Sequence, residues 1–463
     1  MADQTLSRRQ ALAALGLGAF GACSSTQPEP AAERRPNIVL IMSDDLGYEC
    51  LGCYGGTSYK TPKLDALAAT GLRLNHAYSQ PLCTPTRIQL MTGQYNFRNW
   101  MAFGILDPAA KTFGHMMQEA GYKTCISGKW QLYSYNPVDF EPEFRGIGMP
   151  PEDAGFDDWF LWHARHTDDK GSRYPDPVIL DNGAPVDGND KYGPDLYVDR
   201  INSFMEANQD EPFFVYYPMA LTHGPFNPTP NSEVSADGDR FESNSKKYFG
   251  DMVEHMDYSI GRIVSKLDEL GLREDTLILY FSDNGTPKGV ISMMGDVEVA
   301  GGKGLPTDAG TRVPMIVNWP GKTPEGVVLD DLIDSTDFVP TIADITGAAA
   351  LQPNDGRSFA PQLRGETGNA KDVILCWHDP RPGVNKENYT RLELWARDRR
   401  FKLYDDGRLY DVPADVLEEN PIPVGEGSAD AESARAKLRA ALDGIPADKR
   451  DPIWDPYAPF RDA

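Results

Sequence analysis

The chain has 463 residues, with 45 lysines and arginines against 69 aspartates and glutamates, which leaves a formal net charge of −24. A surface of that sign argues against nucleic acid or an anionic bilayer as the main partner. An anionic substrate would therefore have to meet positive charge inside the site itself. The length predicts one large domain with a smaller one, and the six cysteines are too scattered to form a disulfide framework.

The first 35 residues have the pattern of an export signal followed by a tether. Ser7-Arg8-Arg9-Gln10-Ala11-Leu12 resembles the twin-arginine signature, and the apolar run behind it is shorter than the ~20 residues that span a bilayer. The run ends in Phe20-Gly21-Ala22-Cys23, which resembles a bacterial lipobox. We expect lipidation of Cys23 and a periplasmic or cell-surface lipoprotein that meets the membrane through its lipid anchor only. The alternative is a soluble periplasmic protein with an ordinary cleaved signal.

Two apolar runs, residues 37–42 and 276–281, are followed by side chains that suit a metal ion. Asp44-Asp45 follows the first run, and Asp283-Asn284 follows the second. Such runs are typical of buried parallel strands, and open α/β sheets place their sites at the carboxyl ends of these strands. Carboxylate and amide oxygens are ligands for Ca²⁺ or Mg²⁺. Either motif alone is more often a polar turn, but two of them at equivalent strand ends favour a metal site.

Cys83 precedes a short predicted helix. Thr84 can serve as its N-cap, Pro85 as its first residue and Gly93 as its stop. Arg87 lies one turn further on, where its guanidinium can approach the cysteine. A cysteine beside the positive end of a helix and an arginine is placed for chemistry on an anion. The alternative is a small buried thiol in a loop.

Basic side chains stand at other predicted strand ends. Lys129 ends a short apolar strand, His223 follows a second strand before a Gly-Pro turn, and Lys303 lies in a glycine-rich basic loop. A lysine at a strand end can supply the local positive charge that an anion site requires. His223 is a candidate acid or base. Each of these residues, taken alone, can equally be a solvated or structural side chain.

The segment 133–190 is rich in Pro, Gly, Asp and aromatic residues, and we interpret it as a long insertion that shapes a substrate mouth. Beyond residue 350, short strands, a hairpin turn at Asp405-Asp406-Gly407 and a terminal helix predict a small antiparallel sheet-plus-helix subdomain. The expected fold class is α/β, with a large, mostly parallel sheet flanked by helices. The expected parts are the signal and tether (1–35), a catalytic domain (36–350) and a connector with the C-terminal subdomain (351–463).

Six motifs in chain order resemble the formylglycine-dependent sulfatases of the alkaline-phosphatase-like superfamily. They are Asp44-Asp45, Cys83-Thr84-Pro85-Thr86-Arg87, Gly128-Lys129-Trp130, His223 with Pro225, Asp283-Asn284-Gly285, and Lys303 followed by Gly310-Thr311-Arg312-Val313-Pro314. The resemblance runs from about residue 36 to the end of the chain. It implies the large mixed sheet of that superfamily. One Cys-x-Pro-x-Arg match is a modest signal, whereas six blocks in the right order are a strong one.

The resemblance implies that a separate maturation enzyme oxidises Cys83 to formylglycine, whose aldehyde hydrate is the nucleophile. It also implies one Ca²⁺ ion, held by the modified residue 83 together with Asp44, Asp45, Asp283 and Asn284. The hydrate and the sulfate oxygens would be held by Arg87, Lys129 and Lys303. His223 would assist departure of the alcohol. Elementary chemistry agrees, because a sulfate ester carries charge on its terminal oxygens and needs a cationic clamp.

Gln131 departs from the pattern of the family, which reads Gly-Lys-x-His at this point. The histidine is credited there with taking the proton from the second hydroxyl of the hydrate. Glutamine can hydrogen-bond in the site, and so belongs to the candidate substrate-binding residues, but it cannot be the base. We keep the enzyme hypothesis because every metal and clamp position is present. His76 and His378 are other histidines that could enter the site instead.

Three functions are therefore open from the sequence. The first is a sulfuric ester hydrolase that acts on a sulfated carbohydrate, which the export signal and the aromatic-rich segment favour. The second is a phosphodiesterase or phosphonate monoester hydrolase of the same superfamily, because the same clamp would serve another tetrahedral anionic ester. The third is a catalytically impaired lipoprotein that binds sulfated glycans.

Overall fold

A computed structural model describes residues 34–134, 145–167, 169–233, 239–243, 247–379 and 392–450. The twin-arginine motif and Cys23 lie outside these residues, so export and lipidation stay predictions. The described residues from Arg35 onward belong to one compact unit. Within the described ranges, no helix is both long and apolar enough to cross a membrane.

The centre of the unit is a ten-stranded sheet with β1 (Asn37–Ser43) in its middle. β1 pairs in parallel with β8 (Thr276–Ser282) on one side and with β7 (Phe213–Pro218) on the other. From β7 the parallel order continues through β3 (Lys123–Lys129) to β4 (Asp158–Trp162). Five parallel neighbours place their carboxyl ends along one edge, where open α/β sheets carry their sites.

The remaining strands extend this parallel block in both directions. β11 (Met315–Asn318) runs antiparallel between β8 and β2 (Leu72–Tyr78), and β12 (Val327–Asp334) pairs with β2 in parallel. At the other edge β5 (Ile179–Asp181) and β6 (Ala184–Pro185) continue antiparallel from β4. This mixed, mostly parallel sheet confirms the predicted fold class.

Burial on both faces explains the continuous apolar sequence of β1. Ile38 and Leu40 belong to one hydrophobic core, whereas Val39 and Ile41 belong to a second core on the opposite face. Neighbouring residues of a strand point to opposite faces, so a strand that is covered on both sides has no polar positions. β1 is buried at all seven residues.

Helices supply the apolar side chains that cover each face. The core that contains Val39 takes residues from α1 (Pro62–Ala69), α5 (Gly193–Ala207) and α6 (Phe249–Glu269). The core that contains Ile38 takes residues from α2 (Cys83–Thr92), α4 (Phe113–Glu119) and α8 (Phe338–Thr346). The shorter α-helices of the described residues are α3 (Asn96–Asn99), α7 (Asp308–Thr311) and α9 (Ala360–Leu363).

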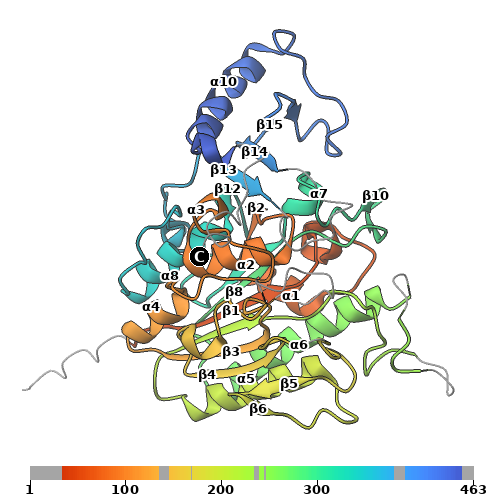
Figure 1. Ribbon diagram of the computed structural model, residues 1–463, viewed down its shortest axis with the longest axis vertical. Coiled ribbons are helices and arrows are strands. Elements are labelled where there is room, and N and C mark those ends of the chain that lie inside the picture. Colours follow the sequence, from red (N-terminus) through yellow and green to blue (C-terminus); the bar gives the residue numbers. More distant parts are fainter. Residues whose placement is uncertain are drawn as a thin grey trace, which may run out of the picture. The chain divides into compact units, whose positions relative to one another are not determined.

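A four-stranded antiparallel sheet follows near the C-terminus. Its strands are β13 (Ile374–His378), β14 (Glu393–Arg397), β15 (Phe401–Tyr404) and β16 (Leu409–Asp411). α10 (Ala429–Asp443) packs against β14 and β15, as the blue part of Figure 1 shows. This arrangement confirms the predicted small sheet with a helix, while the domain border at residue 350 stays a prediction.

The C-terminal sheet contacts the segment that carries Lys303. Arg397 at the end of β14 forms a buried ion pair with Asp308 at the start of α7, with Nη1 2.9 Å from the carboxylate. Lys402 of β15 donates to the carbonyl oxygen of Pro306 at 2.7 Å. The small sheet therefore holds the loop that follows Lys303.

Two parts of the sequence interpretation need correction. Residues 133–190 are not only a surface insertion, because β4, β5 and β6 lie in this range and widen the main sheet. β4 is five residues long and largely aromatic, too short for its periodicity to stand out. The hairpin of β9 (Ile291–Met294) with β10 (Val297–Ala300) was also not predicted.

Candidate active site

The side chains predicted to bind a metal meet where β1 and β8 end. Asp44 and Asp45 follow β1, and Asp283 and Asn284 follow β8. Backbone hydrogen bonds continue the strand pairing into both loops, from Asp283 N to Ser43 O and from Leu46 N to Asn284 O, each at 3.1 Å. All four residues are buried, with at most 1% exposure. The expected meeting of the two strand ends is confirmed.

Cys83 is the first residue of α2, so the helix begins earlier than predicted. Leu82 is the N-cap, and the prediction that Thr84 would be the cap is wrong. The Thr84 hydroxyl instead accepts a hydrogen bond from Gly104 N at 3.1 Å. Pro85 is tolerated in the first turn, where backbone N–H groups have no partner within the helix. Gly93 is the left-handed C-cap, as predicted.

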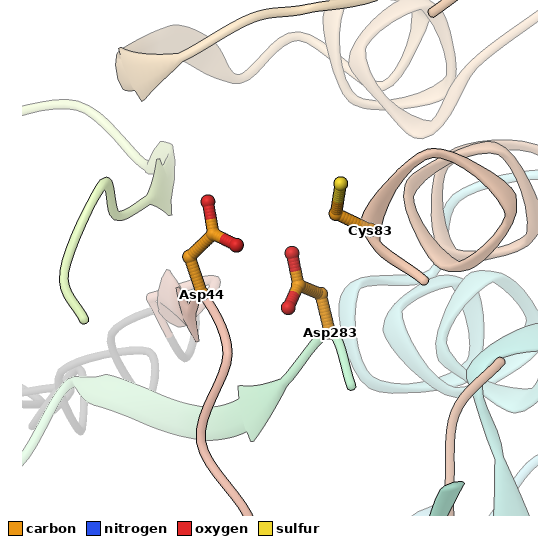
Figure 2. A group of neighbouring side chains, drawn as sticks. All are labelled: Asp44, Cys83 and Asp283. Atoms are coloured by element: carbon orange, nitrogen blue, oxygen red, sulfur yellow. The ribbon is translucent and has the colours of Figure 1, made fainter. Parts of the chain in front are cut away.

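One hydrogen bond fixes the start of α2 against the end of β8. The hydroxyl of Thr86 donates to the carbonyl oxygen of Asp283 at 2.6 Å. Figure 2 shows the carboxyl groups of Asp44 and Asp283 facing the same space as the thiol of Cys83. One possible ligand atom from each of these three residues lies within 4.8 Å of the others. The buried cysteine thus stands at the positive end of a helix dipole, beside two carboxylates.

Arg87 contacts both of these carboxylates. Its Nη2 lies 3.1 Å from Asp283 Oδ2 and 3.5 Å from Asp44 Oδ2, and its Nη1 donates to Lys129 O at 3.1 Å. Burial by itself would lower the pKa of this guanidinium, but the two carboxylates outweigh that effect and raise it. Arg87 is therefore a fixed positive charge, and its buried Nε has no hydrogen-bond partner among the residues that the structure describes.

Lys129, the last residue of β3, is the close partner of Asp44, with Nζ 2.7 Å from Oδ2. Burial by itself would raise the pKa of Asp44, but the charges of Lys129 and Arg87 hold it well below its ordinary value. Burial, and then the neighbouring charge of Asp44, raise the pKa of Asp283 to about 7. The two carboxyl groups beside Cys83 thus differ strongly in acidity.

Lys303 pairs with the second aspartate, with Nζ 2.7 Å from the Asp45 carboxylate. Asn284 Nδ2 donates to the same carboxylate at 2.8 Å. Burial raises the pKa of Asp45, while Lys303 acts in the opposite direction. The Lys303 side chain retains 19% exposure. It therefore lies where the buried site meets solvent.

His223 follows β7 and is also partly open, with 26% side-chain exposure. Thr222 N donates to Asp44 O at 2.6 Å, which fixes the histidine loop beside the end of β1. The His223 Nδ1 lies 2.6 Å from the carbonyl oxygen of Gly224, and Nε2 lies 3.8 Å from Asp45 Oδ2. Burial and then the charge of Lys303 hold the pKa of His223 well below its ordinary value. The ring is therefore neutral at neutral pH.

The residues at the strand ends fit a hard divalent cation. Asp44 Oδ1 and Asn284 Oδ1 are both buried and accept no hydrogen bond from the described residues. Buried polar oxygens are nearly always satisfied, so two orphaned acceptors at the ends of neighbouring strands favour a ligand. The donor set of three carboxylates and one amide oxygen is of the type that binds Ca²⁺.

Gln131 lies beside Cys83. Its Oε1 is 3.9 Å from Cys83 Sγ, and its side chain is buried. The other two histidines considered from the sequence lie elsewhere. The charges around His76 belong to Arg397, Arg312 and Asp330, and burial alone lowers the pKa of His378, at the end of β13, to about 3. Sequence reasoning passed over Arg173 in the aromatic-rich segment, whose charge contributes to lowering the pKa of His223.

Comparisons with known proteins agree with this geometry. The profile of the sulfatase family matches residues 36–348. The chain belongs to the sulfatase family. A second profile, described as the C-terminal part of N-sulphoglucosamine sulphohydrolase, matches residues 303–438 and so covers the small sheet.

Individual sulfatases show the same relationship. Arylsulfatase A of Homo sapiens is 32% identical, with 76% of this chain and 72% of that protein covered. N-acetylgalactosamine-6-O-sulfatase of Bacteroides thetaiotaomicron is 27% identical, with 87% and 94% covered. A solved structure in complex with D-glucosamine-2-N,6-O-disulfate superposes with a TM-score of 0.72 at 22% identity, covering 90% of this chain and 99% of that one. The last match shows the fold.

Membership in the family, together with relatives named as sulfatases over most of the chain, identifies this sulfatase as an enzyme that hydrolyses sulfate esters. The resemblance found in the sequence is thereby confirmed at the level of family, fold and reaction class. Sulfatases in general depend on formylglycine. The modification, the metal and the substrate of this particular chain belong to the proposal that follows.

Proposed function

We propose that this sulfatase removes sulfate from a sulfated carbohydrate, using formylglycine derived from Cys83 and one Ca²⁺ ion. The observation that carries the proposal is the position of Cys83. It is buried at the positive end of α2, within 4.8 Å of two carboxylate oxygens and 3.9 Å from Gln131. A cysteine that served only for packing would not be expected to lie among three cationic side chains and three aspartates.

Position 83 supplies the nucleophile after a separate maturation enzyme has oxidised the cysteine. The hydrated aldehyde carries two hydroxyls on one carbon, so that one can attack sulfur, and the other can afterwards release its proton to water and expel the sulfate, which restores the aldehyde. An unmodified thiol or hydroxyl lacks this way of resetting. Ca²⁺, when bound, would withdraw charge from the sulfate oxygens and from the nucleophile. It would be held by residue 83 with Asp44, Asp45, Asp283 and Asn284.

The cations of the chain bind and orient the sulfate group. Arg87 and Lys129 are fixed by their carboxylate partners, and such preorganised charge stabilises the charge that develops during the reaction. Lys303, being partly exposed, is placed to meet the sulfate as it enters. Three clamp cations inside a chain of net charge −24 give an anion one locally attractive region.

His223 assists departure of the alcohol. The ring is neutral in the free site, but an anionic sulfate ester beside it favours the protonated form, since an opposite charge raises the pKa of a histidine. Nδ1 is engaged with Gly224 O, which leaves Nε2 to give its proton to the leaving oxygen. Gln131 can orient the nucleophile by a hydrogen bond but does not exchange a proton.

The carbohydrate part of the proposal is supported by two similarities. A Bacteroides relative is an N-acetylgalactosamine-6-O-sulfatase, and a protein of the same fold was solved with a disulfated glucosamine. The twin-arginine pattern supports export of a protein that has already folded and been modified. Lipidation at Cys23 would then anchor it to a bacterial membrane from the periplasmic or cell-surface side.

Two measurements test the proposal on protein produced together with a maturation enzyme. Mass spectrometry of the peptide that contains Cys83 should find the aldehyde or its hydrate in place of the thiol. A panel of sulfated sugars and phosphodiesters should show turnover of sulfate esters, with Cys83→Ala as the inactive control. Faster turnover of phosphodiesters, or an unmodified thiol in a protein that still binds sulfated glycans, would contradict the proposal in favour of the hydrolase or binding-protein alternatives.

A further inference from the structure

Arg173 is a positive charge near the site for which the described residues provide no carboxylate partner. Its guanidinium carbon lies 4.0 Å from the centre of the Trp162 ring, and its buried Nη1 finds no hydrogen-bond partner within the described part of the chain. The clamp residues Arg87, Lys129 and Lys303, by contrast, each have an aspartate within 3.1 Å. An unpaired, partly buried guanidinium is unusual, because arginine is normally buried only with an anion.

The fold places Arg173 between the end of β3, which carries Lys129, and the loop that carries His223. Trp162, on which Arg173 lies, is the last residue of β4 and pairs directly with Lys129 of β3. The next residue, Tyr174, is fully buried, and its single hydroxyl hydrogen is shared between the carbonyl oxygens of Ala220 at 2.6 Å and His223 at 2.5 Å. Arg173 is thus held between the strand that carries the clamp lysine and the loop that carries the candidate acid.

His163 adds a second unsatisfied group at this place. It follows Trp162, is 6% exposed, and both of its ring nitrogens are buried without a partner among the described residues. Its carbonyl oxygen accepts a hydrogen bond from Gln131 N at 3.3 Å, so the two residues are neighbours across the ends of β3 and β4. Burial, and then the charges of Lys170, Lys129 and Arg173, hold the pKa of His163 well below its ordinary value. A neutral imidazole can still donate one hydrogen bond.

Lys170 completes a concentration of positive charge beside Cys83. Burial, and then the charges of Arg173 and Lys129, lower the pKa of Lys170 to about 8, while Cys83 acts in the opposite direction. The same Arg173 charge lowers the pKa of His223. These mutual effects place Arg173, His163 and Lys170 within electrostatic reach of both the clamp and the candidate acid.

We propose that Arg173, with His163 and Lys170, forms a second anion subsite that binds another carboxylate or sulfate group of the sugar whose sulfate ester reacts at residue 83. The enzyme would then act on sugars with at least two anionic groups. Arginine is suited to either group because its planar fork donates two parallel hydrogen bonds to a carboxylate or a sulfate. The stacked Trp162 ring holds that fork in place. This inference rests on the proposed function, because that proposal places the reacting sulfate at residue 83.

The test compares three substrates that share one sulfated sugar. One carries no other charge, the second carries a further sulfate, and the third is a disaccharide with a uronate carboxylate. For Arg173→Gln, we expect kcat/KM for a doubly anionic sugar to fall about 10- to 100-fold more than kcat/KM for the singly sulfated sugar, the range of one charge-assisted hydrogen bond. Whichever of the two doubly anionic sugars suffers the larger loss identifies the second group. Arg173→Lys, which keeps the charge, should restore part of the preference.

Arg165→Gln is the matched control. Arg165 lies in the same segment and contacts two aromatic rings, but it already has Glu152 as a partner at 2.6 Å. Its replacement should leave the ratio of the kcat/KM values unchanged. An equal loss on all three sugars in Arg173→Gln, or a loss as large in Arg165→Gln, would overturn the subsite.

A separate readout distinguishes failure of the subsite from failure of the proposed function. Hydrolysis of 4-nitrophenyl sulfate by the wild type reports the reaction centre without a second anion. If that activity is absent, calorimetric binding of the disulfated sugar to the wild type and to Arg173→Gln still tests the subsite. Equal affinity of both proteins for the disulfated sugar would then overturn it, and weaker binding by the variant would support it.

Discussion

Lys129 Nζ lies 2.7 Å from Asp44 Oδ2, and both side chains are completely buried behind the end of the central strand. This pair joins a lysine of the proposed sulfate clamp to a carboxylate of the proposed metal site. Arg87 is the second cation near Asp44, at 3.5 Å. The pair is therefore a buried structural element as well as part of the proposed reaction centre.

We expect Lys129→Met to be inactive and less stable by about 3–5 kcal/mol, the effect of leaving one member of a buried pair without its partner. Arg87 will compensate in part because it also faces Asp44. Urea denaturation measures the stability, and sulfate release measures the activity. The double variant Lys129→Met with Asp44→Asn should recover stability but not activity. A double variant as unstable as the single one would contradict this account.

For His223→Gln, the loss of activity should depend on the leaving group. A sugar alcohol needs a proton to depart, whereas 4-nitrophenolate departs readily without one. We expect kcat to fall about 10²- to 10⁴-fold on a sulfated sugar and much less on 4-nitrophenyl sulfate. Equal losses on both substrates would show that His223 binds the sulfate rather than donating a proton.

Calcium affinity should fall as the pH drops below about 7. The carboxyl of Asp283 has a pKa raised from its ordinary value of 3.8 to about 7, by burial and then by Asp44, so below this pH a proton must leave before a cation binds. The expected slope is about tenfold per pH unit below the pKa and flat above it. In the metal-free protein, the same group favours folding below pH 4 and loses this contribution as the pH rises to 7. Calorimetry across this range measures the slope, and Asp283→Asn should abolish it.

Gln131→His tests whether the departure from the family pattern limits turnover. The wild type should already release sulfate, because the chain has a suitable residue at every candidate clamp and metal-ligand position. The Gln131 side chain also lies close enough to Cys83 to contact it. We expect the variant to be faster by about 10- to 100-fold, the lower part of the range for an added general base. Single-turnover and steady-state kinetics measure the gain. Activity that appears only in the variant would mean that the natural protein is a binding protein.

Arg397→Met should destabilise the attachment of the small sheet. Arg397 and Asp308 form a buried pair at 2.9 Å, so its loss should lower the free energy of unfolding by about 3–5 kcal/mol. The matched control is Arg400→Met, whose pair with Asp411 is exposed and should contribute no more than about 1 kcal/mol. Denaturant titration of both variants measures the difference. Similar values for the two would show that the C-terminal sheet is held by its apolar contacts.

The sequence alone determined the family, the fold class and the principal candidate residues. The reason is that these signals lie in short contiguous segments. β1 and β8 are each a continuous apolar run followed by a polar pair, which is the pattern expected of strands buried on both faces. The helix that begins at Cys83 could also be predicted from the sequence, because Pro85 and Gly93 mark its first turn and its end. These features depend on residues that are close together in the chain.

Only the tertiary structure decided which distant charges satisfy one another. Lys129 pairs with Asp44 across 85 positions and Lys303 with Asp45 across 258, and the sequence carries no local sign of either pairing. For the same reason, Arg173 could not be recognised as a candidate residue from the sequence. Its lack of a carboxylate partner in the described ranges, its stacking on Trp162 and the link of Tyr174 to His223 exist only once β4 joins the main sheet beside β3.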